Sequence, residues 1–204
     1  MPLQDIIDLL AAFYQAEVMS RNRDFIFDEN IEDVIIQVAE YIVNPRSEFG
    51  IIFYGMPGNG KTTMVLTLQK FINYVGARGY FDYMKKENSY FKYGLTLLDS
   101  NQIVRKYRED LAWYDELRFR DQLAIDDLGK EPTDVMIFGN ICQPVIDLID
   151  YRYRRQLFTV VTSNLTGPEI RAKYGDRIAD RFNEMLHTVA FHGETYRRNI
   201  QESI

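Results

Sequence analysis

The chain has 204 residues, a length that allows one well-buried α/β domain with a small appendage and excludes two domains of ordinary size. Its composition, 46% hydrophobic and 26% charged, is typical of a globular protein, and no apolar run approaches the roughly 18 residues of a membrane span. The net charge of −6 gives no general nucleic-acid footprint, and the single cysteine, Cys142, excludes an internal disulfide and favours the cytoplasm.

The charges are unevenly distributed along the chain. Of the 24 Lys and Arg and the 30 Asp and Glu, residues 151–204 hold 9 and 6, which leaves 15 and 24 for residues 1–150. This basic last part suits contact with a phosphate backbone, and solvated surface charge would give the same pattern. Both interpretations stay open.

The first residues predict helices. Residues 3–18 place apolar side chains at roughly helical intervals, so we expect an amphipathic helix whose apolar face docks on the core or on a partner. The start, MPLQDIIDLLAAF, has two aspartates in its apolar run and no basic leader, so no signal peptide is expected. After a polar hinge at 20–24, Asn30 is the expected N-cap of a second helix that ends before Pro45. Residues 1–47 are therefore predicted to form an N-terminal helical extension.

The stretch Gly55–Thr63, GMPGNGKTT, follows an apolar strand at 50–54 and precedes a predicted helix that runs to about Tyr74. It fits the pattern G-x-x-x-x-G-K-[ST], in which backbone N–H groups turn toward phosphate oxygens at the positive end of a helix. Lys61 is expected to reach the β- and γ-phosphates, and the Thr62 hydroxyl to ligate Mg²⁺. The predicted ATP-binding residues are Gly55, Pro57, Gly58, Asn59, Gly60, Lys61, Thr62 and Thr63.

Residues 76–93 interleave tyrosine and phenylalanine with lysine. Such a pattern is typical of a surface that stacks the bases of a single strand, although aromatic residues more often fill a core. Next we expect a strand at 94–98, and then a helix with Ser100 as its N-cap that runs through Leu117.

A second motif, LAIDDLG, spans residues 123–129. An apolar strand that ends in two carboxylates presents them to a nucleotide at the carboxyl edge of a doubly wound sheet. Asp126 is expected to hold Mg²⁺ through water, and Asp127 to polarise the attacking water. Together with the phosphate-binding loop, the motif predicts ATP hydrolysis.

The last third contains further candidates. A helix is predicted from about 135 to 155, with Pro144 as a kink or break, and it ends in the basic cluster of Arg152, Arg154 and Arg155. The strand that follows ends in Asn164, whose amide is placed to contact the γ-phosphate or the water; an Asx-turn would also explain an asparagine there.

A helix at 176–185 and a final strand at 187–196 complete the predicted elements. In this helix Arg177 and Arg181 lie four residues apart on one face, where an ion pair between Arg177 and Asp180 or Asp176 is expected.

The ordered set GMPGNGKTT, LAIDDLG, LIDYRYRRQLFTVVTSNL, YGDRIADRFNEM and GETYRR, over about residues 50–198, resembles the ATPase domain of the DnaC/IstB family of AAA+ proteins. That family comprises bacterial helicase loaders and transposition accessory ATPases. The resemblance implies that residues 48–204 form an α/β P-loop NTPase core of the AAA+ RecA-like type. Three αβα layers and a mainly parallel five-stranded sheet are then expected.

The resemblance also assigns roles to residues. Gly55, Gly60, Lys61 and Thr62 correspond to Walker A, Asp126 and Asp127 to Walker B, and Asn164 to sensor 1. Arg181 corresponds to the arginine of box VII and would be an arginine finger that completes the ATP site of a neighbouring subunit. Self-assembly into a ring, spiral or filament is therefore implied.

Three departures from the family pattern modify these expectations. Many AAA+ proteins have glutamate where Asp127 stands, so slow hydrolysis is expected. No separate helical lid domain is expected after the core. About 50 residues precede the core, fewer than DnaC-type loaders use to bind the helicase. Both a replicative helicase and a transposase therefore stay open as the partner.

The leading prediction is an ATP-dependent loader or remodeller in DNA replication, acting on single- or double-stranded DNA or on a helicase. Within the family, the alternative is an accessory ATPase of a transposon or phage. A small-molecule kinase would share the phosphate-binding loop but would need an arginine-rich lid and a second substrate pocket. A nucleotide switch without hydrolysis is the remaining alternative, because of Asp127.

Overall fold

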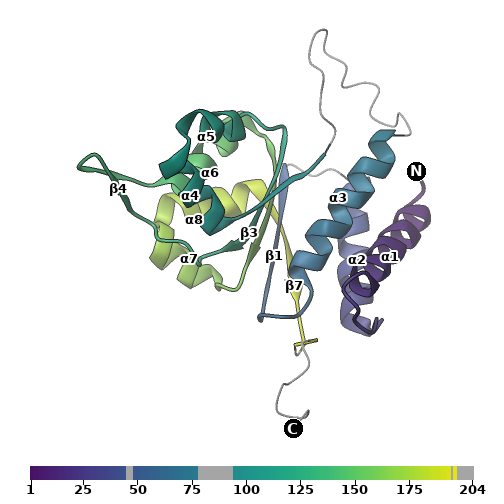
Figure 1. Ribbon diagram of the computed structural model, residues 1–204. Helices are drawn as coiled ribbons and strands as arrows, with labels where there is room; N and C mark the ends of the chain where they lie inside the picture. The colour runs from purple at the N-terminus through teal and green to yellow at the C-terminus, as the bar shows by residue number, and fades with distance from the viewer. Residues whose placement is uncertain (45–47, 78–93, 194, 197–204) are drawn as a thin grey trace.

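A computed structural model describes residues 1–44, 48–77, 94–193 and 195–196. Within them, five parallel strands form one sheet in the order β2-β3-β6-β1-β7 (Figure 1). The strands are β1 (Gly50–Gly55), β2 (Thr96–Asp99), β3 (Gln122–Leu128), β6 (Phe158–Ser163) and β7 (Leu186–Phe191). Strand β1 lies between β6 and β7, with Gly50 opposite Thr159 and Leu186, so the strand that leads into the phosphate-binding loop is held on both sides.

Alternating side chains of the sheet face two separate cores. Ile51 and Phe53 point into the first core and Ile52 into the second, as the two-residue period of a strand requires. The first core is covered by α1 (Leu3–Met19), α2 (Glu29–Val43) and α3 (Lys61–Ala77). The second is covered by α4 (Ser100–Glu109), α5 (Leu111–Arg118), α6 (Pro144–Arg155), α7 (Gly167–Tyr174) and α8 (Asp176–Met185). The three-layer αβα arrangement predicted from the sequence is confirmed (Figure 1).

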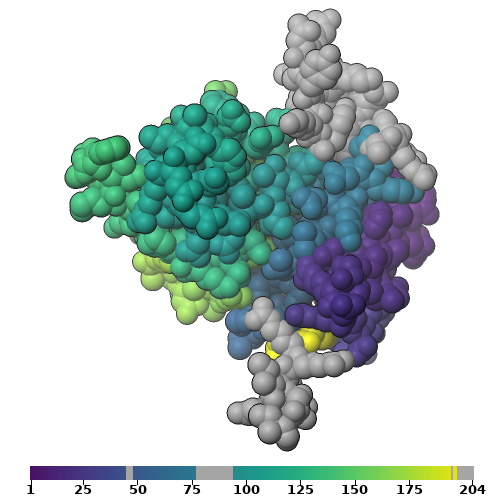
Figure 2. Space-filling model, viewed as in Figure 1, coloured from purple at the N-terminus to yellow at the C-terminus, as the bar shows by residue number. Residues whose placement is uncertain are grey.

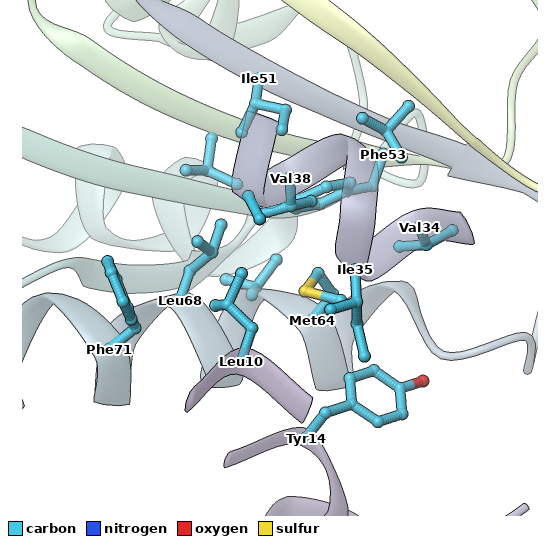
Figure 3. Close-up of a cluster of buried hydrophobic side chains, with 14 of the residues drawn as sticks. Leu10, Tyr14, Val34, Ile35, Val38, Ile51, Phe53, Met64, Leu68 and Phe71 are labelled. Carbon is cyan, nitrogen blue, oxygen red and sulfur yellow. The ribbon is translucent and has the colours of Figure 1, made fainter. Parts of the chain in front are cut away.

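Both N-terminal helices pack on the core of the molecule. Leu10 and Tyr14 of α1 face Met64 and Leu68 of α3 (Figure 3). From α2, Val38 approaches Phe53 of the sheet, and Leu10 has 0% of its surface exposed. The amphipathic helix predicted at 3–18 is confirmed, and its apolar face docks on the core.

The prediction of one helix over 135–155 is wrong. The first part is a hairpin of β4 (Val135–Ile137) and β5 (Asn140–Cys142), which projects from the body (Figures 1 and 2). Its two-residue turn, Phe138 and Gly139, has positive φ at both positions, 49° and 82°, as a tight hairpin turn requires. Pro144 occupies the first turn of α6, where its missing N–H costs nothing, so it begins the helix instead of kinking it.

The predicted helix from Ser100 through Leu117 is interrupted at Asp110. This residue ends α4, and its carboxylate accepts a hydrogen bond from the Trp113 N–H at 3.0 Å to begin α5. The N-cap of α4 is Asp99, which forms a capping box with Gln102. Ser100 is instead buried, and its hydroxyl donates to the Asp127 carbonyl at 2.9 Å.

The N-cap of α2 is Asp28, not Asn30. The Asp28 carboxylate accepts from the Ile31 N–H at 2.9 Å. The Asn30 side chain instead bonds the residue that follows β7: its oxygen accepts from the His192 N–H at 2.9 Å. Strand β7 correspondingly ends at Phe191, five residues before the predicted end.

None of the helices in these ranges is long and apolar enough to cross a membrane. The aromatic and lysine stretch predicted at 76–93 lies outside the described residues from position 78 onward.

Candidate nucleotide-binding site

The loop that begins at the end of β1 has positive φ at its three glycines, and two of them also leave no room for a side chain. Gly55 and Gly60 have φ of 148° and 104°. A Cβ at Gly55 would overlap the Phe191 carbonyl oxygen, and one at Gly60 would overlap the Tyr14 hydroxyl. Both glycines of the motif are therefore required by conformation and by space, and the loop forms a close-walled cradle.

Asn59 braces this cradle from inside. Its side chain is 0% exposed, and its amide nitrogen donates to the Phe191 carbonyl at 3.0 Å. The Lys61 ammonium donates to the carbonyls of Gly55 and Met56 at 2.7 and 2.8 Å, and to the Asn59 side-chain oxygen at 3.2 Å. The cation is thus held within the loop, and its contact with phosphate stays a prediction.

The end of the described chain also secures the loop. The Tyr196 N–H donates to the Gly58 carbonyl at 3.1 Å. Its hydroxyl donates to Asp28 at 2.6 Å, at the start of α2. One residue of the GETYRR motif therefore joins the loop to the N-terminal helices.

Asp126 lies at the end of β3, directly across from Thr62. The Thr62 hydroxyl is 3.0 and 3.1 Å from the two carboxylate oxygens, and the Thr162 hydroxyl donates to one of them at 2.5 Å. Burial raises the pKa of Asp126; the hydrogen bonds from Thr162 and Thr62 oppose this increase, and the nearby Asp127 charge adds to it. A hydroxyl beside a carboxylate is an oxygen donor set that suits Mg²⁺.

Asp127, unlike Asp126, lines a cavity beside the loop, and it does so from a strained position. Its φ is 55°, where the register of β3 against β6 shifts, and its N–H donates to the Thr162 hydroxyl at 2.8 Å. The Asp127 carboxylate forms an ion pair with Lys130. Glu131, the neighbouring acid, is buried and accepts from Tyr174 and the Gly129 N–H, and it does not line the cavity.

Asn164 lines the cavity at the end of β6. Its side-chain oxygen is buried and has no hydrogen-bond partner within the described chain. The turn beyond the strand is made by Ser163, whose hydroxyl oxygen accepts from the Leu165 N–H at 3.1 Å. An Asx-turn therefore does not explain Asn164, and its unsatisfied oxygen suits a water or ligand in the cavity.

The cavity has a volume of about 220 Å³. One wall is the phosphate-binding loop with Asp127, Lys130 and Asn164. The rest of the lining includes residues of α1, of the segment that follows it and of α2: Tyr14, Val18, Arg21, Arg23, Asp24, Phe25, Ile26 and Ile31. These residues were not predicted to line the site, because residues 20–24 were interpreted as a polar hinge. A signal existed, because Tyr14, Glu17 and Arg21 continue the helical stripe of Ile6 and Leu10.

Arg181 lies on α8, outside this cavity. Its guanidinium pairs with the buried Asp150 and lies 4.8 Å from the centre of the Tyr153 ring. Arg154 and Arg177 reach the same carboxylate, Arg177 at 3.4 Å. The expected pairing of Arg177 with Asp176 or Asp180 is wrong, because Arg171 occupies both of those acids. A role for Arg181 at a neighbour's site stays a prediction.

The predicted basic cluster at the end of α6 is only partly at the surface. Arg152 is 0% exposed and donates to the carbonyls of Arg120 and Phe158 at 2.7 and 2.6 Å. Burial lowers the pKa of Arg152 to about 9. Because Arg152 fastens α6 to the start of β6, the central strand, it is not available to a nucleic acid.

Solved structures share this arrangement. The DnaC helicase loader is similar with a TM-score of 0.60 and 17% identity, over 88% of this chain and 98% of that one. DnaI is similar with a TM-score of 0.59 and 16% identity, over 94% of this chain and 95% of that one. The fold is that of a DnaC-type AAA+ domain. AMPPCP-bound DnaA from Aquifex aeolicus is also similar, with a TM-score of 0.52 and 17% identity over 82% of this chain and 48% of that one.

At such identities the likeness shows the fold. No protein-family model matches the chain, and no curated protein matches it. The AAA+ fold class predicted from the motifs is nevertheless confirmed. The loop follows β1, the aspartate pair lies in the last residues of β3, and Asn164 follows β6; these are three adjacent strands whose carboxyl ends share one edge of the sheet.

Proposed function

We propose that the chain is an ATP-binding and ATP-hydrolysing AAA+ protein of DNA replication, and that it acts as a DnaC-like helicase loader. The observation that carries the nucleotide site is the meeting of Thr62 with Asp126, beside a glycine cradle that encloses Lys61. These are the parts that a phosphate chain and its Mg²⁺ need, brought together from β1, α3 and β3.

Each residue has a distinct task in this proposal. Lys61 and the loop N–H groups bind the β- and γ-phosphates, while Thr62 and Asp126 hold Mg²⁺, which neutralises charge on the phosphate oxygens. The ion pair between Asp127 and Lys130 breaks, and Asp127 then orients the attacking water. Asn164 positions that water or the γ-phosphate. Because Asp127 is neutralised by an ion pair and strained at φ 55°, slow turnover is expected until assembly or DNA rearranges it.

The loader role rests on the likeness to the DnaC helicase loader and to DnaI, which extends over 98% and 95% of those chains. By this proposal the partners are further copies of the chain, a replicative helicase and DNA. DnaA, an AAA+ neighbour, has been solved bound to AMPPCP and single-stranded DNA. Such a protein works in the cytoplasm.

The test is ATP turnover measured alone and with single-stranded DNA, double-stranded DNA or nucleosides. Stimulation by single-stranded DNA supports the loader, and stimulation by double-stranded DNA alone favours a transposition accessory ATPase. Stimulation by nucleosides alone would mean a small-molecule kinase. Asp127→Asn should keep ATP affinity and lower turnover about 100-fold or more, because it removes the charge that polarises water. Unchanged turnover in this variant would exclude Asp127 as the base.

A further inference from the structure

Arg21 lies in the turn after α1 and reaches across to the phosphate-binding loop. Its Nη1 is 3.4 Å from the Thr63 hydroxyl oxygen, and it lines the cavity. Thr63 follows Thr62 at the start of α3, where backbone N–H groups favour anions. A guanidinium from the N-terminal segment therefore stands beside the first turn of the phosphate-binding helix.

An ion network around the buried Glu17 carboxylate holds this guanidinium in place. Arg21 Nη2 donates to a Glu17 carboxylate oxygen at 2.8 Å, and Lys70 of α3 pairs with the other oxygen at 2.6 Å. Glu17 is only 8% exposed. Burial alone would raise the pKa of Glu17, but the hydrogen bonds from Lys70 and Arg21 outweigh it and lower that pKa. One carboxylate between two cations leaves one net positive charge, which suits an anionic ligand.

The position of Arg21 indicates which end of a bound nucleotide it would contact. Thr62 and Asp126 mark the end of the site where Mg²⁺ and the terminal phosphates bind. Arg21 instead contacts Thr63, the next residue along the helix, and the apolar side chains of Phe25, Ile26 and Ile31 line the same cavity. Such side chains suit a nucleoside, so a guanidinium shared by the loop and this part of the lining would meet a nucleotide where the nucleoside joins its phosphates.

We propose that Arg21 is a nucleotide-binding residue that contacts the phosphate nearest the nucleoside. The inference rests on the proposed function, since it requires that the loop binds ATP. Guanidinium is suited to this task, because it has five N–H donors and can keep Glu17 while binding a phosphate. Nucleotide binding then strengthens the docking of α1 on α3, because the same side chain contacts both.

The test is calorimetric titration of ATP, ADP and AMP, with Mg²⁺, into wild type and Arg21→Ala. Loss of one charge-assisted hydrogen bond should raise the Kd for ATP and for ADP by the same factor, about 10- to 100-fold. Lys70→Met is the matched control, since it removes the other cation on Glu17 without touching the cavity, and it should shift both Kd values less than threefold. Lys61→Ala, which removes the cation of the loop itself, reports on the site as a whole.

The outcomes separate this inference from the proposed function. If wild type binds ATP, Lys61→Ala does not and Arg21→Ala binds both nucleotides as wild type does, the site stands and the role of Arg21 is wrong. If Arg21→Ala bound ATP more weakly but ADP as wild type does, Arg21 would contact the terminal phosphate, and the proposal would be overturned. An equal loss in Lys70→Met would mean that Arg21 acts only by docking α1. A wild type that binds no nucleotide would overturn both.

Discussion

Asp126 is the residue at which stability and function oppose each other. Because burial raises its pKa, the ionised carboxylate is less favourable in the folded chain than in the unfolded one, so its charge lowers the stability of the nucleotide-free fold at neutral pH. The same ionised oxygens are those that Mg²⁺ needs, together with the Thr62 hydroxyl at 3.0 Å. This is the pattern expected where a site gives up stability for its ligand.

Asp126→Asn should therefore raise the Tm of the nucleotide-free protein at pH 7, by roughly 1 to 3 °C, while it abolishes the effect of Mg²⁺ on ATP affinity. Asparagine keeps an acceptor for the Thr162 hydroxyl and carries no charge. The pH dependence of the Tm checks the sign. A raised pKa means that wild type loses stability as the pH rises through that pKa, whereas Asp126→Asn does not. The Tm values of wild type and variant should therefore be similar in acid and differ at pH values above the pKa of Asp126. A lower Tm for the variant at pH 7 would contradict the account.

Residues with a fixed spacing were predictable from sequence, and residues brought in by packing were not. Lys61, Thr62 and Asp126 follow from the motifs because the backbone geometry of a loop or strand end fixes where they point. Arg21 and Tyr196 enter the site only because α1 and the last strand pack beside the loop. For Asn164 the sequence left two interpretations, contact with the phosphate or water and an Asx-turn. Only the structure, in which Ser163 makes the turn, excludes the Asx-turn.

At the scale of elements, long periodic segments were predicted well and short apolar ones were not. The helix at 176–185 and the strands around the site have the periods of their structures. Residues 135–142 are apolar and short, and they form a hairpin only because Gly139 and Pro144 fix a turn and a helix start. Val135 at the base of the hairpin is buried in the second core, whereas Phe138 at its tip is 97% exposed.

Helix α1 is a structural part of the domain, and this can be measured. Leu10→Ala should lower the free energy of unfolding in urea by about 2 to 5 kcal/mol, because it leaves a cavity between α1 and α3. Phe138→Ser is the control on an exposed apolar residue, and its effect should stay within about 0.5 kcal/mol. Equal effects of the two substitutions would mean that α1 is not docked in solution.

At the scale of the whole molecule, the proposed mechanism requires more than one copy. The cavity contains Lys61, Asp127 and Asn164, but Arg181 lies outside it on α8, held by Asp150. A guanidinium that acts on phosphate from there must act on a neighbouring subunit. The domain boundary between residues 1–47 and 48–204 is a related prediction, although the packing of α1 and α2 joins the two parts into one core.

Arg181→Ala should leave the affinity for ATP unchanged and lower the turnover rate by a factor of about 10³ to 10⁵, because the guanidinium stabilises charge only in the transition state. Mixing this protein with Lys61→Ala should restore activity, because the first supplies a working loop and the second a working Arg181. Arg177→Ala is the control, since Arg177 also reaches Asp150 but is an exposed ion-pair partner, and its loss should matter less. Turnover independent of protein concentration, with no rescue on mixing, would mean that no finger acts between subunits.

The claim on which the whole account depends is that the loop from Gly55 to Thr63 binds ATP with Mg²⁺. Isothermal titration of ATP with Mg²⁺ into wild type and into Lys61→Ala tests it most directly. The account predicts one site per chain in wild type and a loss of affinity of at least about 100-fold in the variant, because Lys61 is the loop's only side-chain cation for the phosphates. Equal affinity in the two proteins, or no binding in wild type, would contradict it.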